Sequence, residues 1–255
     1  MRKDNLPAFI IGGAPRSGTT YLATGLARHP QVRMAQPLIP EPKVFMTYEQ
    51  SESFYFDRYR ALFDGAPQAA ICGEKTSYYL ESSQARDLIH KLLPEVRLLF
   101  IVREPVARAY SNYLWTRKNG LETLSFEDAI ASEGRVSPLP PEKAYVRPFD
   151  YLSRSHYAAL ARPYLNLFGP DRVRFLLYED IALRPARLWE EIQMFLGLAP
   201  VAWKILDAGV VNSASDSGDA IRSETLADLR EHMRPLVDDF HQLTHLDLSS
   251  WGYAA

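Results

Sequence analysis

The chain begins with a short apolar segment that leads directly into a glycine-bearing loop. Residues 8–12 have the length and apolar character of a buried strand, and residues 12–20 read GGAPRSGTT. Residues 19–28 follow with a helical spacing of apolar and small side chains. A strand, a glycine loop and a helix in this order place backbone N–H groups and a helix N-terminus around an anion. The pattern predicts an anion-binding loop at the start of an α/β fold.

Strand and helix patterns alternate along the rest of the chain. Further strands are predicted at residues 69–73, 97–102 and 173–178. Further helices are predicted at residues 83–93, 105–120, 151–168, 187–196 and 223–243, the last with a break near Pro235, and a short helix capped by Ser125. The alternation favours a three-layer, P-loop-like α/β fold with a central, mostly parallel sheet flanked by helices.

Among the predicted strands, residues 97–102 give the clearest signal, because LLFIV is a continuous apolar run. A strand buried on both faces has this composition, so we expect it to be central in the sheet. The chain of 255 residues shows no internal repeat and is interpreted as a single domain, 1–255. Residues 134–150 contain four prolines, Pro138, Pro140, Pro141 and Pro148, and are predicted to form a mobile loop.

Charge and cysteine content narrow the function classes. The net charge of -2 gives no general attraction to nucleic acid or to anionic membrane, so no nucleic-acid partner is expected. Cys72 is the single cysteine, which excludes an internal disulfide and fits a reducing compartment. The first apolar stretch is too short for an export signal or a membrane span. We therefore expect a cytoplasmic protein.

The glycine loop departs from the nucleoside-triphosphate pattern at one position. Gly13 and Gly18 have the Walker A spacing, but Thr19 occupies the position of the lysine that contacts the β- and γ-phosphates. The missing lysine weakens one possible function, that of a P-loop nucleotide kinase or NTPase. One cation, Arg16, and several hydroxyl groups suit a single phosphate better. A second alternative is a non-catalytic nucleotide- or carbohydrate-binding protein on the same scaffold.

Residues 15–20, PRSGTT, resemble the 5′-phosphosulfate-binding loop of sulfotransferases that use 3′-phosphoadenosine 5′-phosphosulfate (PAPS). Residues 102–113, VREPVARAYSNY, are similar to the segment in which this family binds the 3′-phosphate through a strand-end arginine and a helix serine. Those residues are Arg103 and Ser111 here. A planar guanidinium pairs well with two phosphate oxygens.

Two further segments resemble the family's catalytic parts. EPKVF at 41–45 is similar to the segment that carries the catalytic base in heparan-sulfate-type and bacterial members, and GEKTSYY at 73–79 is similar to the one that carries a catalytic lysine. The resemblance extends in family order from about Phe9 to Trp251. It is strongest in the donor-binding parts, where Arg16 matches the arginine of members that sulfate protein tyrosines.

The resemblance implies a PAPS-dependent sulfotransferase that needs no metal. It implies catalytic roles for Glu41, Lys75 and Arg16. It also implies that the glycine loop, the 3′-phosphate segment and a loop at 209–222 that would cover the donor bind PAPS. The residues concerned are Arg16, Ser17, Gly18, Thr19, Thr20, Arg103, Ser111, Ser213 and Arg222. His156 is expected either to border the acceptor cleft or to be structural. The acceptor is a hydroxyl or amine of a carbohydrate, peptide, lipid or small molecule, and the sequence leaves the choice open.

Overall fold

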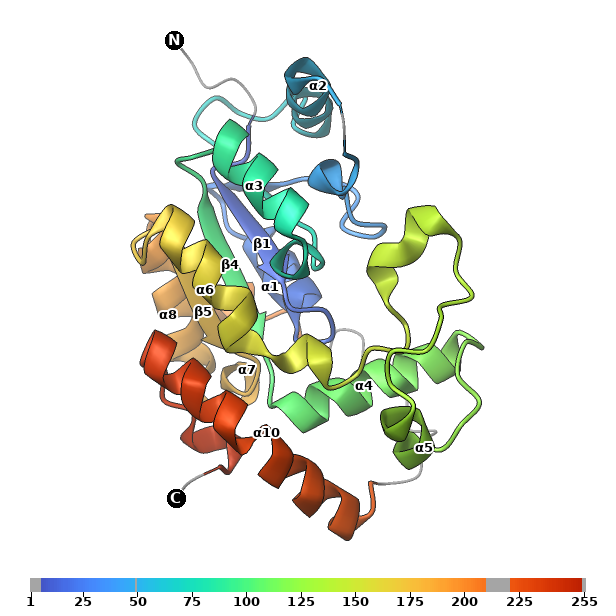
Figure 1. Ribbon diagram of the computed structural model, residues 1–255. Coiled ribbons are helices and arrows are strands. Elements are labelled where there is room, and N and C mark those ends of the chain that lie inside the picture. Colours follow the sequence, from blue (N-terminus) through green and yellow to red (C-terminus); the bar gives the residue numbers. More distant parts are fainter. Residues whose placement is uncertain (1–5, 49, 210–220, 254–255) are drawn as a thin grey trace. The chain divides into compact units, whose positions relative to one another are not determined.

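The computed structural model of the chain describes residues 6–48, 50–209 and 221–253 (Figure 1). The chain divides into two compact units, which are described separately below. The first consists of the described residues of 1–102 and 164–212, and the second of those of 103–163 and 213–255. Both units come from one continuous chain, and the single domain expected from the sequence stays a prediction.

The first unit contains a five-stranded sheet in the order β2-β3-β1-β4-β5, in which all neighbours are parallel. The strands are β1 (Phe9–Gly13), β2 (Val32–Met34), β3 (Ile71–Lys75), β4 (Arg97–Val102) and β5 (Val173–Leu177). The prediction of a central parallel sheet flanked by helices is therefore confirmed. β4 lies inside the sheet between β1 and β5, as its apolar run indicated, and β1 is the middle strand.

The first unit also contains the helices that flank the sheet or pack on one another. They are α1 (Thr19–Leu26), α2 (Glu52–Leu62), α3 (Ser83–Leu92), α7 (Asp180–Leu183), α8 (Pro185–Leu196) and α9 (Trp203–Leu206), with the short 3-10 helices η1 (Val44–Met46) and η2 (Tyr79–Glu81). One core cluster joins β1 and β4 to α1, α8 and α9, where Leu22, Trp189 and Leu206 are fully buried. A different group of rings surrounds Phe100, which lies 4.8 Å from Tyr164 and 5.2 Å from Phe175 between ring centroids.

The second unit is mainly helical. It contains α4 (Pro105–Lys118), α5 (Phe126–Ala131), η3 (Pro141–Val146), η4 (Ser153–Ser155), the first half of α6 (Tyr157–Phe168), α10 (Ser223–Thr244) and η5 (Ser249–Trp251). Its core includes stacked rings of Phe240 and Trp251, with Tyr157 beside both. No helix among the described residues is long and apolar enough to cross a membrane.

Three sequence expectations need correction. β3 begins and ends two residues later than the predicted 69–73, and the polar pair Glu74 and Lys75 is buried inside the strand. α6 begins at Tyr157 instead of 151, since the Glu133 carboxylate accepts the backbone N–H groups of residues 151–153 and satisfies them outside a helix. The prediction of a helix break near Pro235 is also wrong. α10 continues through this proline, and Met233 and Val237 on its inner face are buried.

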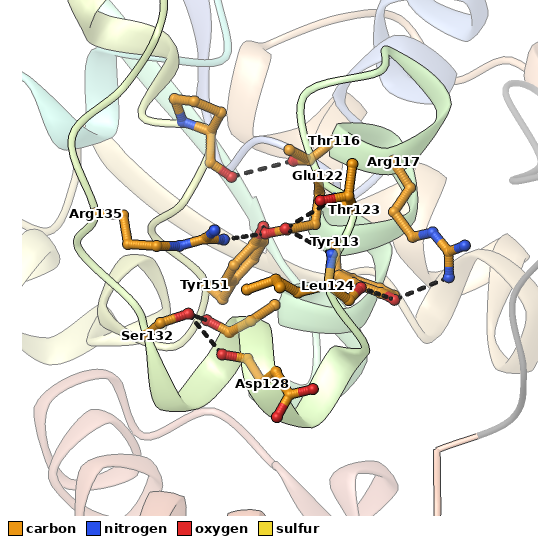
Figure 2. Close-up of polar contacts among 12 residues, drawn as sticks. Tyr113, Thr116, Arg117, Glu122, Thr123, Leu124, Asp128, Ser132, Arg135 and Tyr151 are labelled. Carbon is orange, nitrogen blue, oxygen red and sulfur yellow. Dashed lines mark hydrogen bonds and ion pairs between the residues drawn. The ribbon is translucent and has the colours of Figure 1, made fainter.

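A buried carboxylate organises part of the second unit (Figure 2). Glu122 accepts hydrogen bonds from the backbone N–H groups of Thr123, at 3.0 Å, and Leu124, at 3.1 Å. The Tyr151 hydroxyl donates to Glu122 Oε2 at 2.7 Å, and Arg135 forms an ion pair with the same oxygen. Burial by itself would raise the pKa of Glu122, but the hydrogen bonds and Arg135 hold it below its ordinary value.

The proline-rich segment is attached to this centre. The Arg135 guanidinium lies over the Phe149 ring, 4.3 Å from its centroid, and Gly134 N–H donates to Phe149 O at 3.1 Å. The Thr116 hydroxyl, on α4, donates to Pro148 O at 3.1 Å. These contacts hold both ends of the segment, and the mobility of the part between them stays a prediction.

We expect Glu122→Gln to lower the free energy of unfolding by about 1–3 kcal/mol near pH 7, because Arg135 loses its charged partner and the amide cannot accept every bond that the carboxylate accepts. A carboxyl with a lowered folded-state pKa stabilises above its unfolded pKa and loses this contribution as the pH falls through the folded pKa. The difference between variant and wild type should therefore shrink at acid pH. Urea unfolding at pH 7 and pH 4 measures both, and a pH-independent difference would contradict the assignment.

Candidate active site

The glycine loop connects β1 to α1 in the first unit. Ala14 N–H donates to Ile101 O, on β4, at 2.7 Å, and Ser17 N–H donates to Ala14 O at 3.3 Å. Gly18 precedes α1 with φ 93°, and Arg16 also has a positive φ, of 68°. No side chain caps α1. The first N–H groups of a helix have no intrahelical acceptors, so the loop presents donors at the carboxyl end of β1.

Close packing explains both glycines of this loop. A Cβ at Gly13 would lie 2.7 Å from Leu80 Cβ, and a Cβ at Gly18 would lie 2.9 Å from Ile181 Cδ1. Ser17 is fully buried, and its hydroxyl has no hydrogen-bond partner among the described residues. An unused buried hydroxyl beside a helix N-terminus and a loop arginine fits a bound phosphate group.

Lys75 and Glu41 form an ion pair beside the loop. Lys75, the last residue of β3, places Nζ 3.0 Å from Glu41 Oε1, and its side chain is only 3% exposed against 13% for Glu41. Nζ also lies 3.4 Å from the Thr20 hydroxyl on α1. Two of the three residues predicted to be catalytic thus meet, although 34 positions separate them in the chain. Lys75 connects the carboxylate to the helix that follows the loop.

Ser77 completes this group, and sequence reasoning assigned it no role. Its backbone N–H donates to Glu41 Oε2 at 3.1 Å, and its hydroxyl donates to Glu41 Oε1. The Thr19 hydroxyl lies 3.1 Å from Ser77 Oγ and acts as the donor, because the Ser77 proton is used toward Glu41. Ser77 is two residues beyond Lys75, and this period-two spacing after a strand was the available signal.

Three backbone contacts hold the segment that carries Glu41. Lys43 N–H donates to the Thr76 hydroxyl at 3.1 Å, and Phe45 N–H donates to the Tyr79 hydroxyl at 3.1 Å. The Arg58 guanidinium, on α2, donates to the carbonyl of Pro42 at 3.2 Å. The segment has little regular structure, so these bonds from Thr76, η2 and α2 fix the position of its carboxylate.

The predicted 3′-phosphate residues belong to the second unit. Arg103 directly follows β4, and its backbone N–H and C=O both contact the Tyr157 hydroxyl, at 3.4 and 2.8 Å. Glu104 caps α4 by accepting N–H groups of its first turn, and Tyr253 donates to Glu104 Oε1 at 2.6 Å. Ser111 lies on α4 and is 7% exposed. Two tyrosines therefore hold the chain where it enters α4.

The remaining predicted site residues are placed differently. Arg222, in the second unit, is 71% exposed and forms an ion pair with Glu127 at 2.9 Å. Ser213 lies outside the described residues. His156 is half-buried just before α6. Within the described ranges, no group of three or more His, Cys, Asp or Glu side chains is arranged to hold a metal ion. That the reaction needs no metal stays a prediction.

Comparisons with known proteins match this chain to sulfotransferases. A family model described as sulfotransferase domain matches residues 6–234. Human heparan sulfate glucosamine 3-O-sulfotransferase 6 is 31% identical, with 76% of this chain and 53% of that protein covered. Human bifunctional heparan sulfate N-deacetylase/N-sulfotransferase 3 is 26% identical, covering 77% and 23%. This chain thus spans about half the length, or less, of these two curated relatives.

Solved structures agree with the sequence matches. The crystal structure of a sulfotransferase from Alicyclobacillus acidocaldarius superposes with a TM-score of 0.75, 26% identity, and coverage of 97% of this chain and 99% of that one. A mouse sulfotransferase, SULT7A1, complexed with PAP gives a TM-score of 0.57 at 15% identity, covering 91% and 84%. The second likeness shows a shared fold.

Proposed function

Because this chain belongs to the sulfotransferase domain family, we propose that it transfers the sulfuryl group of PAPS to a hydroxyl or amine of an acceptor. The family match over residues 6–234 confirms the family predicted from the sequence. One observation carries the proposal: Lys75 Nζ lies between Glu41, at 3.0 Å, and Thr20, at 3.4 Å. A carboxylate and a cation thus stand next to an anion-binding loop.

We assign the 5′ end of the donor to the glycine loop. The N–H groups at the start of α1, the Ser17 hydroxyl and Arg16 supply the donors that an anionic phosphate group requires. Arg103 and Ser111 are assigned to the 3′-phosphate, and Ser213 and Arg222 to a covering loop, on the family resemblance. When bound, PAPS supplies the sulfuryl group and departs as the 3′,5′-bisphosphate.

Glu41 is assigned as the general base. Its Oε atoms take the proton of the acceptor hydroxyl or amine as a bond forms between the acceptor atom and sulfur, and the bond from sulfur to the phosphate oxygen breaks. Ser77 fixes the orientation of this carboxylate through its N–H and hydroxyl groups. Aligning the two reactants and fixing the base in this way removes much of the entropic barrier.

Lys75 and Arg16 are assigned to the negative charge that develops on the departing oxygen. Lys75 can also donate a proton, whereas an arginine retains its proton and acts through charge and hydrogen bonds alone. Preorganised cations in a site shielded from water stabilise such charge strongly. In the structure Lys75 also forms an ion pair with Glu41, so each of these two charges has a partner.

We propose a carbohydrate acceptor ahead of a peptide, lipid or small molecule. The relatives reported above are named for transfer to heparan sulfate, to a glucosamine hydroxyl or to nitrogen. This chain covers only part of those proteins, so the sugar itself is tested by an acceptor panel. We also keep the cytoplasmic location, which the single, buried Cys72 supports.

The two alternative functions, a P-loop NTPase and a non-catalytic binding protein, would require different residues in the site. A P-loop kinase or NTPase needs a lysine where Thr19 stands, and the Thr19 hydroxyl is instead directed to Ser77. A non-catalytic binding protein has no need for a base oriented by two hydrogen bonds from Ser77 and paired with Lys75. Both observations favour transfer chemistry.

Donor recognition is tested by calorimetry with the 3′,5′-bisphosphate. We expect Arg103→Ala to weaken binding by about 10–100-fold, since one charge-assisted phosphate contact contributes about 1.5–3 kcal/mol. Arg162→Ala serves as the control, because Arg162 forms an exposed ion pair with Asp239. Equal affinity for ADP and for the bisphosphate would remove the 3′-phosphate assignment.

The base is tested by Glu41→Gln. This variant should bind the bisphosphate normally but transfer sulfuryl groups at least about 100-fold more slowly, because general base catalysis typically contributes a factor of 10²–10⁴. Glu52→Gln is the control, since Glu52 forms an exposed pair with Lys91. A rate within a few fold of wild type would exclude Glu41 as the base.

The orientation of the base is tested by Ser77→Ala. The variant keeps the backbone N–H but loses the hydroxyl that joins Glu41 to Thr19, so we expect kcat to fall about tenfold while KM for the donor changes little. Steady-state kinetics separates the two parameters. A change in donor KM alone would mean that Ser77 belongs to donor binding instead.

A further inference from the structure

A second acidic residue, Glu74, is adjacent to Lys75 in the sequence and has no role in the sulfuryl transfer proposed for Glu41 and Lys75. Glu74 precedes Lys75 in β3, so the two side chains point to opposite faces of the sheet. Glu74 is fully buried, although a carboxyl group is rarely buried without a partner. Its backbone pairs with Ile10 of β1, which excludes a loop position that could turn toward solvent.

The surroundings of Glu74 are aromatic. Neither carboxyl oxygen has a hydrogen-bond partner among the described residues, and the same holds for the buried Tyr59 hydroxyl. Tyr59, on α2, and Tyr79, in η2, are the groups whose hydroxyls act most strongly on Glu74. Their rings pack around Phe45 at centroid distances of 5.5 and 5.9 Å. The carboxyl group therefore lies in an apolar environment with two phenols nearby.

The charge state of Glu74 follows from this environment. Burial raises the pKa of Glu74 to about 7, against the pull of the Tyr79 and Tyr59 hydroxyls. The charge of Glu41 raises the pKa further, and the charge of Arg58, on α2, lowers it. The same burial, with the charge of Glu74, raises the pKa of both tyrosines well above the ordinary value, so they stay neutral. Glu74 is thus the group of this cluster that titrates near neutral pH.

The cluster is connected to the segment that carries Glu41. Tyr79 accepts the Phe45 N–H, so its own hydroxyl proton is available toward Glu74. Arg58, which also acts on Glu74, donates to the carbonyl of Pro42, the residue after Glu41. Two of the three backbone contacts that hold the Glu41 segment therefore come from residues that sense the charge on Glu74.

We propose that Glu74 is a positioning residue for sulfuryl transfer: as a neutral carboxylic acid it supports the Glu41 segment through Tyr79 and Arg58, and its ionisation disables Glu41. The inference rests on the proposed function. An ionised Glu74 adds a buried negative charge beside the two phenols. It also draws Tyr79 and Arg58 toward itself and away from the Glu41 segment.

The experiment is the pH profile of kcat at saturating donor and acceptor. The wild type should lose activity as the pH rises through about 7, with an about tenfold fall by one unit above the pKa. Glu74→Gln, which keeps the shape of the neutral acid, should retain kcat within about twofold across this range. This fall of kcat above about pH 7 is the alkaline limb of the profile. If the limb persists unchanged in Glu74→Gln, the proposal is overturned.

Two further variants complete the test. Tyr59→Phe removes a hydroxyl that lowers the pKa of Glu74, so the limb should move to higher pH, and this variant serves if Glu74→Gln does not fold. Glu191→Gln is the matched control, because burial raises the pKa of Glu191 too, but it lies on α8 beside Arg174. A limb unmoved in Tyr59→Phe, or removed by Glu191→Gln, contradicts the role of Glu74.

An infrared titration separates this inference from the function on which it rests. The protonated carboxyl band of Glu74 should disappear as the pH rises through about 7 and should be absent from Glu74→Gln, with no substrate present. Absence of that band at pH 6 overturns the inference even if transfer is observed. If the band titrates but no acceptor is sulfated, the proposed function fails, and the positioning role fails with it.

Discussion

The ion pair of Lys75 and Glu41 is the interaction on which the candidate site depends. Both side chains are largely withdrawn from water, at 3% and 13% exposure, and each would be costly without the other. The pair forms because β3 ends at Lys75 beside β1, while the backbone N–H groups of Lys43 and Phe45 bind the hydroxyls of Thr76, just after β3, and Tyr79, in η2. A shift of the β3 register by one residue would exchange Lys75 for Glu74 and remove the site.

The alternation of β3 gives its two last residues opposite environments. Lys75 points to the glycine loop, with one carboxylate and one hydroxyl as partners, whereas Glu74 points to the rings of Tyr59 and Tyr79. Lys75 is held by an ion pair, whereas burial raises the pKa of Glu74 to about 7. One short strand therefore contributes both a fixed charge and a group that titrates near neutrality.

Within each unit, contacts of that unit hold the residues that we propose for donor binding. In the first, α1 and the loop are held by β4 and by close packing at Gly13 and Gly18. In the second, Tyr157 and the capped Glu104 hold the chain around Arg103, while Glu122 holds the proline-rich segment. Binding elements of this kind are precise because buried hydrogen bonds fix their backbones.

The sequence by itself determined four of the five strands, most helices, the glycine loop and the family, because these depend on local apolar periodicity, glycine positions and short motifs. It identified Glu41 and Lys75 from motifs, but not their contact. Tertiary structure alone decided that contact, the hydrogen bonds of Ser77 to Glu41 and the burial of Glu74, which lies just beyond the strand predicted at 69–73. The physical reason is that polarity along the chain is a local property, whereas the partner that allows a charge to be buried comes from a distant segment.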